Sequence, residues 1–353
     1  MNKNKKYILV LGNGQMGEYV ADCLGYDNLV DIVDKEVRDC EIKNRKYING
    51  DFSKLDEIDF TFYDLIVSCV PAKFGFSVLK KCAQEGKNCV DLSFCKEDVF
   101  QLDELAKKNN CCIIPDAGLA PGLTNLFVGR ELYKKKKLDN VEIYVGGVSQ
   151  SPFEKYGYKI TWSVEDLLEE YLRPARAIIL NKIESFNPFA TIINVDINGI
   201  KMESFLADGC RTLLRLKDRI RFLSERTLRW TGHMCQVGRL IDNNNFVEEI
   251  KKNCINGDDT VVFQIRFEEQ WIPIKDITMI YQNYSGCDSN SAMRITTAGT
   301  CQFVSEMVLN DIFNEPGIHP LEHIGQNPIA FQFLIDKLKE TGVYFETNST
   351  DGL

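Results

Sequence analysis

The chain has few of the residues that usually build metal sites. Three of its 353 residues are histidine, and none of its 13 cysteines stands in a C-x-x-C pair. A structural zinc site needs four such ligands, often in closely spaced pairs. His319 and His323 have i, i+4 spacing, but Pro320 lies between them and no third ligand is near in sequence. We therefore expect no metal site, and we interpret the cysteines as reduced thiols of a cytoplasmic protein.

Long apolar segments and an excess of positive charge are also absent. No stretch approaches the roughly 18 apolar residues that a membrane helix needs, and the N-terminus leads into a strand without the apolar region of a secretory signal. The net charge of −9 disfavours nucleic acid or an anionic membrane as a partner. We expect a small-molecule substrate instead. The length and the 44% hydrophobic content are sufficient for two domains.

What the chain does contain is a glycine-rich turn near its start. A hydrophobic strand over 7–11 is followed by Gly12, Gly14 and Gly17, which fit the pattern G-x-G-x-x-G. The first glycine of this pattern turns the chain, the second lets backbone approach a pyrophosphate, and the third lets the helix pack closely. The N–H groups at the start of that helix bind phosphates. The pattern predicts a dinucleotide site that includes Gly12, Gly14, Gln15, Met16 and Gly17.

The end of the second strand indicates which dinucleotide binds. That strand ends at Asp34, whose carboxylate can accept hydrogen bonds from the ribose hydroxyls and would repel a 2′-phosphate. The sequence therefore predicts NAD as the cofactor and NADP as the less favoured one. Lys35 beside Asp34 weakens this preference a little.

The order of strands and helices predicts two domains. Residues 1–122 alternate strand and helix, which is typical of an α/β, Rossmann-type doubly wound parallel sheet. Residues 123–297 are rich in strand-like segments, among them 292–296, and favour an α+β domain with a mixed or antiparallel sheet for substrate binding and oligomerisation. Residues 298–313 are spaced like an amphipathic helix, and we expect 298–353 to rejoin the first domain. The strand-rich domain also suggests a homodimer.

Further cofactor contacts are expected beyond the carboxyl ends of the parallel strands, where such sheets bind their ligands. One group is expected along the dinucleotide and a second nearer to its nicotinamide. The first group is Ser68, Val70 and Pro71, and the second is Ser93, Ala120 and Pro121. The loop 115–122, which contains the last two, is alternatively an ordinary strand-to-helix turn capped by Thr124 or Asn125.

Arginines in the second half of the chain indicate a substrate with a carboxylate. The planar guanidinium binds a carboxylate through paired hydrogen bonds, and we interpret Arg211 and Arg229 as such contacts. Thr212 and Tyr158 are expected to bind the substrate as well. A solvated surface is the alternative. His233 titrates near neutrality and could relay a proton, although a lone histidine is more often structural.

Several of these segments resemble the saccharopine dehydrogenase superfamily. They are the glycine turn at 12–17, the Ala-Gly-Leu-Ala-Pro-Gly loop at 117–122, the run from Ile160 to Tyr171, the Arg-Thr-Leu motifs at 211–213 and 226–228, and the Arg-Trp-Thr-Gly-His segment that ends at His233. Their order matches over nearly the whole chain. The short length and the Leu-Ala-Pro-Gly loop look most like lysine 6-dehydrogenase. Saccharopine reductases tend to carry aspartate before this Pro-Gly, where the chain has Ala120.

The resemblance implies a pyridine-nucleotide dehydrogenase that acts on a carbon bearing an amine. Lysine would yield its 6-semialdehyde and ammonia. An ε-amine with a pKa near 10.4 is almost fully charged at pH 7, so a general base is needed, and Asp116, Glu165 and His233 are the candidates in that order. The alternatives are saccharopine or carboxynorspermidine dehydrogenase chemistry on a secondary amine, and a non-catalytic dinucleotide-sensing protein.

Overall fold

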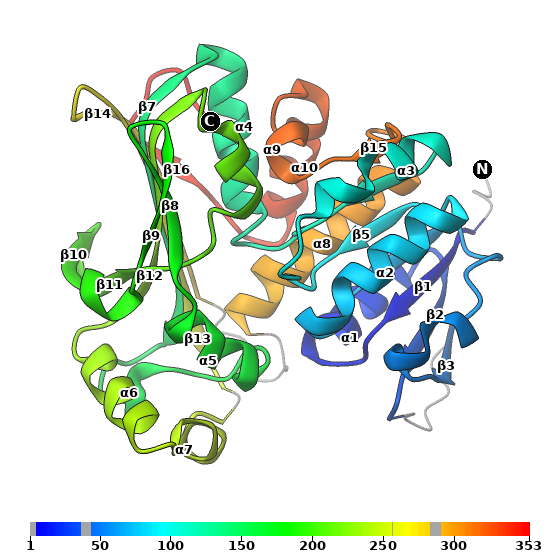
Figure 1. Cartoon of the computed structure of the whole chain (residues 1–353), viewed down its shortest axis with the longest axis horizontal. Coiled ribbons are helices and arrows are strands. Elements are labelled where there is room, and N and C mark those ends of the chain that lie inside the picture. Colours follow the sequence, from blue (N-terminus) through cyan, green and yellow to red (C-terminus); the bar gives the residue numbers. More distant parts are fainter. Residues whose placement is uncertain (1–4, 37–43, 256, 283–290) are drawn as a thin grey trace. The chain divides into compact units, whose positions relative to one another are not determined.

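The computed structural model divides the chain into two compact units. It describes residues 5–36, 44–255, 257–282 and 291–353. The first unit comprises residues 1–130 and 297–340, and the second comprises 131–296 and 341–353 (Figure 1). None of the described helices is both long enough and apolar enough to cross a membrane.

The first unit is built on a seven-stranded sheet whose neighbouring strands are all parallel. The strand order is β15-β6-β5-β4-β1-β2-β3. The strands are β1 (Tyr7–Leu11), β2 (Leu29–Asp34), β3 (Arg45–Asn49), β4 (Leu65–Ser68), β5 (Cys89–Asp91), β6 (Cys112–Ile114) and β15 (Gly317–Ile318). Because β1 lies between β2 and β4, the chain winds outward from the sheet centre in both directions, which is the doubly wound arrangement.

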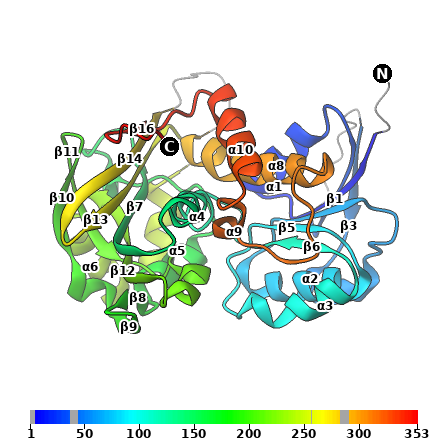
Figure 2. The ribbon, with the colours of Figure 1, turned by 90° about the horizontal axis from the view of Figure 1, so that it is seen from above.

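Helices cover both faces of this sheet. Helix α1 and helix α8 lie on one face, and α2 and α3 lie on the other (Figure 2). Their bounds, with those of the remaining helices, are α1 (Gln15–Leu24), α2 (Ala72–Glu85), α3 (Asp103–Lys108), α4 (Leu123–Lys135), α8 (Ala292–Leu309), α9 (Leu321–Ile324) and α10 (Pro328–Glu340). The apolar side chains of β1 and β4 pack with those of α2 in one core cluster. The strands are apolar on both faces because both are buried.

The second unit contains a nine-stranded mixed sheet. Its main order is β10-β11-β12-β7-β13-β14-β16, and β8 pairs with both β12 and β9. Among these pairs β12 with β7 is parallel and the others are antiparallel. The strands are β7 (Leu138–Ser149), β8 (Ala175–Ile179), β9 (Lys182–Phe186), β10 (Ile193–Ile197), β11 (Ile200–Leu206), β12 (Ile220–Trp230), β13 (Asp259–Glu269), β14 (Ile272–Gln282) and β16 (Glu346–Thr347).

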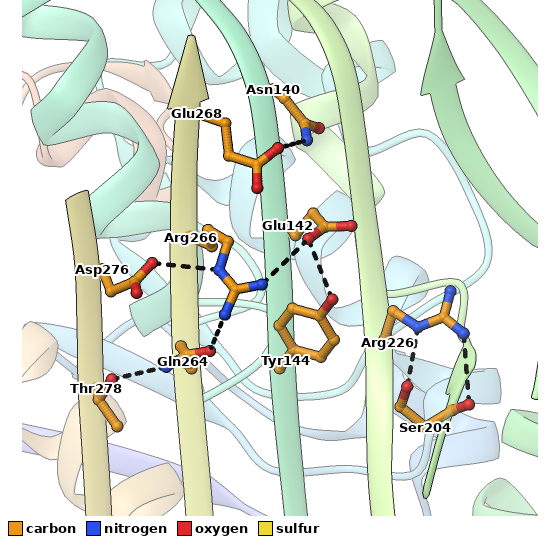
Figure 3. Close-up of polar contacts among 10 residues, drawn as sticks. All are labelled: Asn140, Glu142, Tyr144, Ser204, Arg226, Gln264, Arg266, Glu268, Asp276 and Thr278. Carbon is orange, nitrogen blue, oxygen red and sulfur yellow. Dashed lines mark hydrogen bonds and ion pairs between the residues drawn. The ribbon is translucent and has the colours of Figure 1, made fainter. Parts of the chain in front are cut away.

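The two faces of the second sheet differ in character. On the face that we call inner, Phe205 packs in a core with residues of α5 (Val164–Leu172), α6 (His233–Asp242) and α7 (Phe246–Asn253). Successive side chains of a strand point to opposite faces of the sheet. The strand residues that alternate with the inward ones therefore lie on the other face, which we call outer. On the outer face, polar side chains of β14, β13, β7, β12 and β11 contact one another (Figure 3).

The fold class predicted from the sequence is confirmed. The units differ from the predicted domain limits, since the first extends to Arg130 and residues 341–353 join the second, where β16 pairs with β14. The strand expected at 292–296 is wrong, because these residues form the first turns of α8. Asp259 fixes that helix start by accepting hydrogen bonds from the backbone N–H groups of Ala292 and Met293.

Candidate functional site

The glycine turn of the first unit has the geometry that the sequence predicts for a phosphate-binding loop. Gly12 has a φ of +101°, and a Cβ there would lie 2.5 Å from the carbonyl oxygen of Cys69. A Cβ on Gly17 would collide with the Gly12 carbonyl oxygen. A Cβ on Gly14, in contrast, would meet no described atom within 4 Å. The turn is therefore closed toward the sheet and open at Gly14.

The amino end of α1 presents backbone donors beside this open position. Gly14 is the residue before the helix, and no side chain caps it. Gln15, Met16 and Gly17 form the first turn, in which N–H groups have no partner within the helix. Uncapped N–H groups and the positive end of the helix dipole bind a phosphate well. This arrangement fits the pyrophosphate of a dinucleotide.

Asp34 is held next to the turn. Its Oδ2 accepts a hydrogen bond from the backbone N–H of Asn13 at 2.7 Å, which fixes the carboxylate at the end of β2. The side-chain oxygen of Asn13 is buried without a hydrogen-bond partner among the described residues. A buried acceptor in this condition is costly unless a ligand or water supplies a donor. A carboxylate and an orphaned amide oxygen together fit a ribose with free hydroxyls.

The remaining predicted cofactor contacts lie at the carboxyl edge of the same sheet. Ser68 ends β4, Val70 and Pro71 lead into α2, and Pro71 is exposed. Ser93 follows β5, and its hydroxyl donates to Asp91 at 2.9 Å. The absence of a side chain at Gly75 makes room for this hydroxyl, since a Cβ there would collide with it. None of these contacts to a cofactor is tested by the structure, and they stay predictions.

Asp91 is a buried carboxyl group that sequence reasoning missed. It lies at the end of β5, in register with Ser68 of β4, and is fully buried. Burial, with the negative charge of Asp116, raises its pKa to about 6, while the hydrogen bond from Ser93 opposes the shift. The sequence signal was an acidic residue at the end of an otherwise apolar strand.

Asp116 opens the loop that connects β6 to α4. It is 5% exposed and has a φ of +53°, an unusual conformation for a residue with a side chain. The rest of the loop folds on itself, because the Gly122 N–H donates to Asn125 Oδ1 at 3.3 Å and Asn125 Nδ2 donates to Glu322 at 3.0 Å. Asn125 thus orders the loop, although it is the third residue of α4 and not the cap that the alternative interpretation expected.

Two further predicted residues, Ala120 and Pro121, form the tip of that loop. Pro121 is buried, Ala120 is partly exposed, and the peptide bond between them is cis. Their contact with a nicotinamide stays a prediction.

In the second unit, the candidate substrate residues divide into a buried cluster and two peripheral segments.

Arg229 is the centre of the buried cluster. It is 3% exposed and lies on the inner face of β12. Its Nη2 donates to Glu170 at 3.0 Å, Nη1 to the Leu228 carbonyl at 2.9 Å, and Nε to the Tyr171 hydroxyl at 3.3 Å. A guanidinium has five N–H groups, so one on each terminal nitrogen has no partner in the described part of the chain. These two are the pair that a carboxylate would use.

His233 lies in the same cluster but does not titrate near neutrality. Its Nδ1 lies 2.6 Å from the carbonyl oxygen of Tyr156, which only accepts, so Nδ1 carries the proton and Nε2 accepts from the Tyr171 hydroxyl at 2.8 Å. Burial, with the charge of Arg229, lowers the His233 pKa to about 3. A neutral imidazole does not favour the predicted proton relay, and that role of His233 stays a prediction. The imidazole orients Tyr171, which supports Arg229.

Tyr158 also lies against Arg229. The guanidinium carbon is 5.3 Å from the centre of the Tyr158 ring, a distance at which a cation is attracted to an aromatic face. The Tyr158 hydroxyl is buried and has no hydrogen-bond partner within the described ranges. Burial raises the pKa of this hydroxyl, so it remains a neutral donor. The structure thus brings Tyr158 and Arg229 together, and their contact with a substrate stays a prediction.

Glu165 does not belong to this cluster. It is exposed in the first turn of α5 and forms an ion pair with Lys251 at 2.6 Å. The hydrogen bond from Lys251 lowers the pKa of Glu165, which makes it a weaker base. These contacts do not favour Glu165 as a general base, and that role stays a prediction. The inward carboxylate of the helix is Glu170, which also accepts from Thr227 at 2.6 Å.

Arg211 and Thr212 occupy a separate segment. They begin the short 3₁₀ helix Arg211–Leu216, in which Thr212 is buried and Arg211 is partly exposed with a φ of +48°. Their contact with a substrate stays a prediction.

Glu170 and Tyr171 could have been found from the sequence, because they follow Leu167 at i+3 and i+4 on an amphipathic helix.

Comparisons with known proteins match this chain in sequence and in fold. Residues 118–258 match the family model described as the saccharopine dehydrogenase C-terminal domain. The mitochondrial alpha-aminoadipic semialdehyde synthase of Bos taurus is 26% identical over 198 residues, which cover 51% of this chain and 21% of that protein. Saccharopine dehydrogenase (NADP(+), L-glutamate-forming) of Pyricularia oryzae is 27% identical over 112 residues, which cover 30% of this chain and 25% of that protein. The matches thus span about a quarter or less of these relatives.

A solved structure gives the same fold over nearly the whole chain. It is the apo, histidine-tagged saccharopine dehydrogenase (L-Glu forming) from Saccharomyces cerevisiae, with a TM-score of 0.74 at 17% identity. The match covers 97% of this chain and 99% of that one. The structural match supports a shared fold, and the support for a family relationship comes from the sequence matches. The resemblance to the saccharopine dehydrogenase superfamily that was stated from the sequence motifs is therefore confirmed by the domain model and by the relatives that match in sequence.

Proposed function

We propose that this chain is a pyridine-nucleotide-dependent oxidoreductase acting on a C–N bond of a lysine-like amino acid. Our leading substrate is L-lysine, oxidised at its 6-amino group to the semialdehyde with release of ammonia. The glycine turn, open only at Gly14 and flanked by Asp34, is the observation that carries this proposal. The names of the relatives, which are saccharopine dehydrogenases and aminoadipic semialdehyde synthases, support the choice of substrate class.

The first unit holds the cofactor in this proposal. The N–H groups of Gln15, Met16 and Gly17 bind the pyrophosphate, and Asp34 accepts from the ribose hydroxyls. The bound nicotinamide supplies the acceptor for the hydride that leaves the carbon next to nitrogen. Because Asp34 is negative, we propose NAD as the preferred cofactor. The Pyricularia oryzae relative carries NADP(+) in its name, so the preference has to be measured.

The second unit holds the amino-acid end of the substrate. We assign the substrate carboxylate to the two unused N–H groups of Arg229, whose position Glu170 and Tyr171 fix. The Tyr158 hydroxyl is a second donor in the same place. With Glu165 exposed and His233 neutral, Asp116 remains our proposed base for the substrate amine. Its role is to accept the proton that an ε-ammonium must lose before oxidation.

Two other functions remain alternatives. Saccharopine or carboxynorspermidine dehydrogenase chemistry is favoured by the relatives named for saccharopine, and opposed by Ala120 where saccharopine reductases tend to carry aspartate. A dinucleotide sensor without turnover would keep the glycine turn alone. We also retain the cytoplasm as the proposed location, supported by the free thiols of every described cysteine, and a homodimer as the proposed assembly.

One experiment separates these functions. The full chain is incubated with NAD or NADP and with lysine, ornithine, saccharopine, carboxynorspermidine or a diamine, and the absorbance of the reduced nicotinamide is followed. Reduction with lysine and NAD is the expected result. Reduction only with saccharopine or carboxynorspermidine would replace lysine by a secondary amine, and cofactor binding without any reduction would leave the sensor.

A further inference from the structure

A second buried carboxylate lies beside Arg229 on the inner face of the second sheet. Glu203 of β11 pairs in register with Arg229 of β12, and cross-strand partners in register point to the same face. Glu203 is 5% exposed and Arg229 is 3% exposed. Opposite charges placed in this way attract each other, yet Glu203 forms no ion pair with Arg229 in the described part of the chain. Both of its oxygens are bound elsewhere.

The partners of Glu203 are backbone groups at the start of helix α6. Its Oε2 accepts a hydrogen bond from the N–H of Gly232 at 2.7 Å, and its Oε1 accepts one from the N–H of Met234 at 2.5 Å. His233 lies between these two residues and is the first residue of α6. The first N–H groups of a helix have no partner within it, and a negative charge is favourable there. Glu203 therefore fixes the backbone on both sides of His233.

The ring of His233 makes two contacts that extend to the proposed substrate site. Its Nδ1 donates to the Tyr156 carbonyl at 2.6 Å, and its Nε2 accepts from the Tyr171 hydroxyl at 2.8 Å. Tyr156 has a φ of +61°, an unusual conformation for a residue with a side chain, and Tyr158 follows two positions later. The Tyr171 hydroxyl accepts from Nε of Arg229 at 3.3 Å. The imidazole thus connects α6 with both Tyr158 and Arg229.

We propose that Glu203 is a positioning residue for the site that binds the substrate carboxylate. It acts through His233, by holding the start of α6 where the imidazole meets both of its partners. This inference rests on the proposed function, because it concerns an amino acid bound at Arg229. Since the helix start occupies both oxygens of Glu203, the two unused N–H groups of Arg229 stay available to the substrate.

The position needs a carboxylate because two N–H donors converge on it. A glutamine has the same shape but only one oxygen, so its NH₂ group would meet one of the two backbone donors. Glu203→Gln therefore keeps the volume of the side chain and disturbs the start of α6. Asp259→Asn is a matched control, because Asp259 accepts from two N–H groups at the start of another helix, α8. Urea unfolding shows that both variants fold and measures their stability.

Steady-state kinetics of the full chain provide the first test. In Glu203→Gln, we expect KM for lysine, or for whichever amine the wild type oxidises, to rise at least about fivefold, because hydrogen bonds to a charged group are lost. The value of kcat and the Kd of the cofactor should change little. KM in Asp259→Asn should equal that of the wild type. An unchanged KM in Glu203→Gln, or an equal rise in both variants, would overturn the proposal.

A double-mutant cycle tests whether Glu203 acts through His233. His233→Leu removes both hydrogen bonds of the ring and should itself raise KM. If Glu203 acts through this ring, Glu203→Gln should raise KM no further when it is added to His233→Leu. Independent effects would instead multiply, and that result would overturn the proposed route.

The His233 ring also gives a readout that does not depend on turnover. The chain has three histidines, and comparison with His233→Leu assigns the imidazole nitrogen NMR signals of His233. In the wild type these signals should show a neutral ring with its proton on Nδ1, because the contact with Tyr156 selects that tautomer. Glu203→Gln should give a mixture of tautomers, and Asp259→Asn should resemble the wild type.

Unchanged His233 signals in Glu203→Gln would overturn the proposal whatever the kinetics show. A wild type that oxidises none of the amines would count against the proposed function instead. The His233 signals would then still decide whether Glu203 positions this ring.

Discussion

At the scale of single residues, the candidate sites depend on buried groups whose charge the fold controls. Arg229 stays charged and forms an ion pair with Glu170, His233 is kept neutral by burial, and the pKa of Asp91 is raised by burial. Each of these states follows from what surrounds the side chain. Substitutions of Arg229 and Asp91 test two of these states, and a substitution of Asp34 tests the cofactor site.

Asp34 should determine the cofactor preference. Asp34→Asn keeps an oxygen that can accept from the Asn13 N–H but removes the charge that repels a 2′-phosphate. We expect the ratio of the Kd for NADP to the Kd for NAD to fall about tenfold or more, since a charged hydrogen bond contributes about 1.5–3 kcal/mol. Cofactor titration by fluorescence measures both constants. An unchanged ratio would mean that Asp34 does not contact the ribose.

Arg229 should bind the substrate carboxylate. Arg229→Lys keeps the charge that Glu170 needs but loses the paired N–H groups. We expect KM for the amino acid to rise at least about tenfold with little change in cofactor Kd. Arg221→Ala, at a residue about half exposed, is the matched control. Equal KM values for the Arg229 variant and the wild type would return this arginine to a purely structural role.

Asp91 should make stability depend on pH. Its pKa is about 6 in the folded chain and about 3.9 when unfolded, so the unfolded state releases its proton first as the pH rises. The wild type therefore loses up to about 3 kcal/mol between pH 4 and pH 7 that Asp91→Asn does not lose. Urea unfolding at both pH values measures this difference. Asp27→Asn, at an exposed position, is the control and should lose as much stability between pH 4 and pH 7 as the wild type does. If Asp27→Asn instead kept its stability as Asp91→Asn is expected to do, Asp91 would not be the cause of the pH dependence.

At the scale of elements, one buried ion pair joins a helix to the sheet of the second unit. Lys275 of β14 and Glu131 of α4 are 3.0 Å apart, and their side chains are 4% and 5% exposed. A pair this deep contributes little net stability when intact, but removing one partner strands the other charge in the core. The pair therefore fixes which residues of β14 face inward.

Lys275→Met should destabilise the chain by about 3–5 kcal/mol, because Glu131 is then buried without its cation. Lys275→Met with Glu131→Leu should recover most of the loss, since no charge is left unpaired. Urea unfolding of the three proteins gives the comparison. Lys182→Met, at an exposed position of β9, controls for the loss of a lysine. If the double variant is no more stable than the single one, the ion pair is not the cause.

At the scale of the whole molecule, cofactor binding should increase the stability of the folded chain against unfolding. A cofactor that binds only the folded chain stabilises it by RT ln(1 + [L]/Kd), which is about 2.7 kcal/mol at 100 times Kd. We expect NAD to raise the melting temperature in a concentration-dependent manner. Gly14→Val, which places a side chain in the open position of the turn, should melt near the wild type without NAD and lose the increase. A full NAD response in this variant would remove the glycine turn from the site.

The sequence alone determined the parts of this protein that are local in the chain. The glycine turn, the carboxylate at Asp34 and the alternating strands and helices of the first unit follow from spacing and apolar pattern, which act over a few neighbouring residues. The family resemblance rests on the same kind of local motif.

Only the tertiary structure decided which polar side chains are buried and beside what. Glu165 and Glu170 stand five positions apart on one helix, yet the first is exposed and the second pairs with Arg229. The same dependence on distant strands lowers the pKa of His233, raises that of Asp91, and sets Arg266 between Asp276 and Glu142. Burial and charge environment come from residues far away in sequence, so no local pattern contains them.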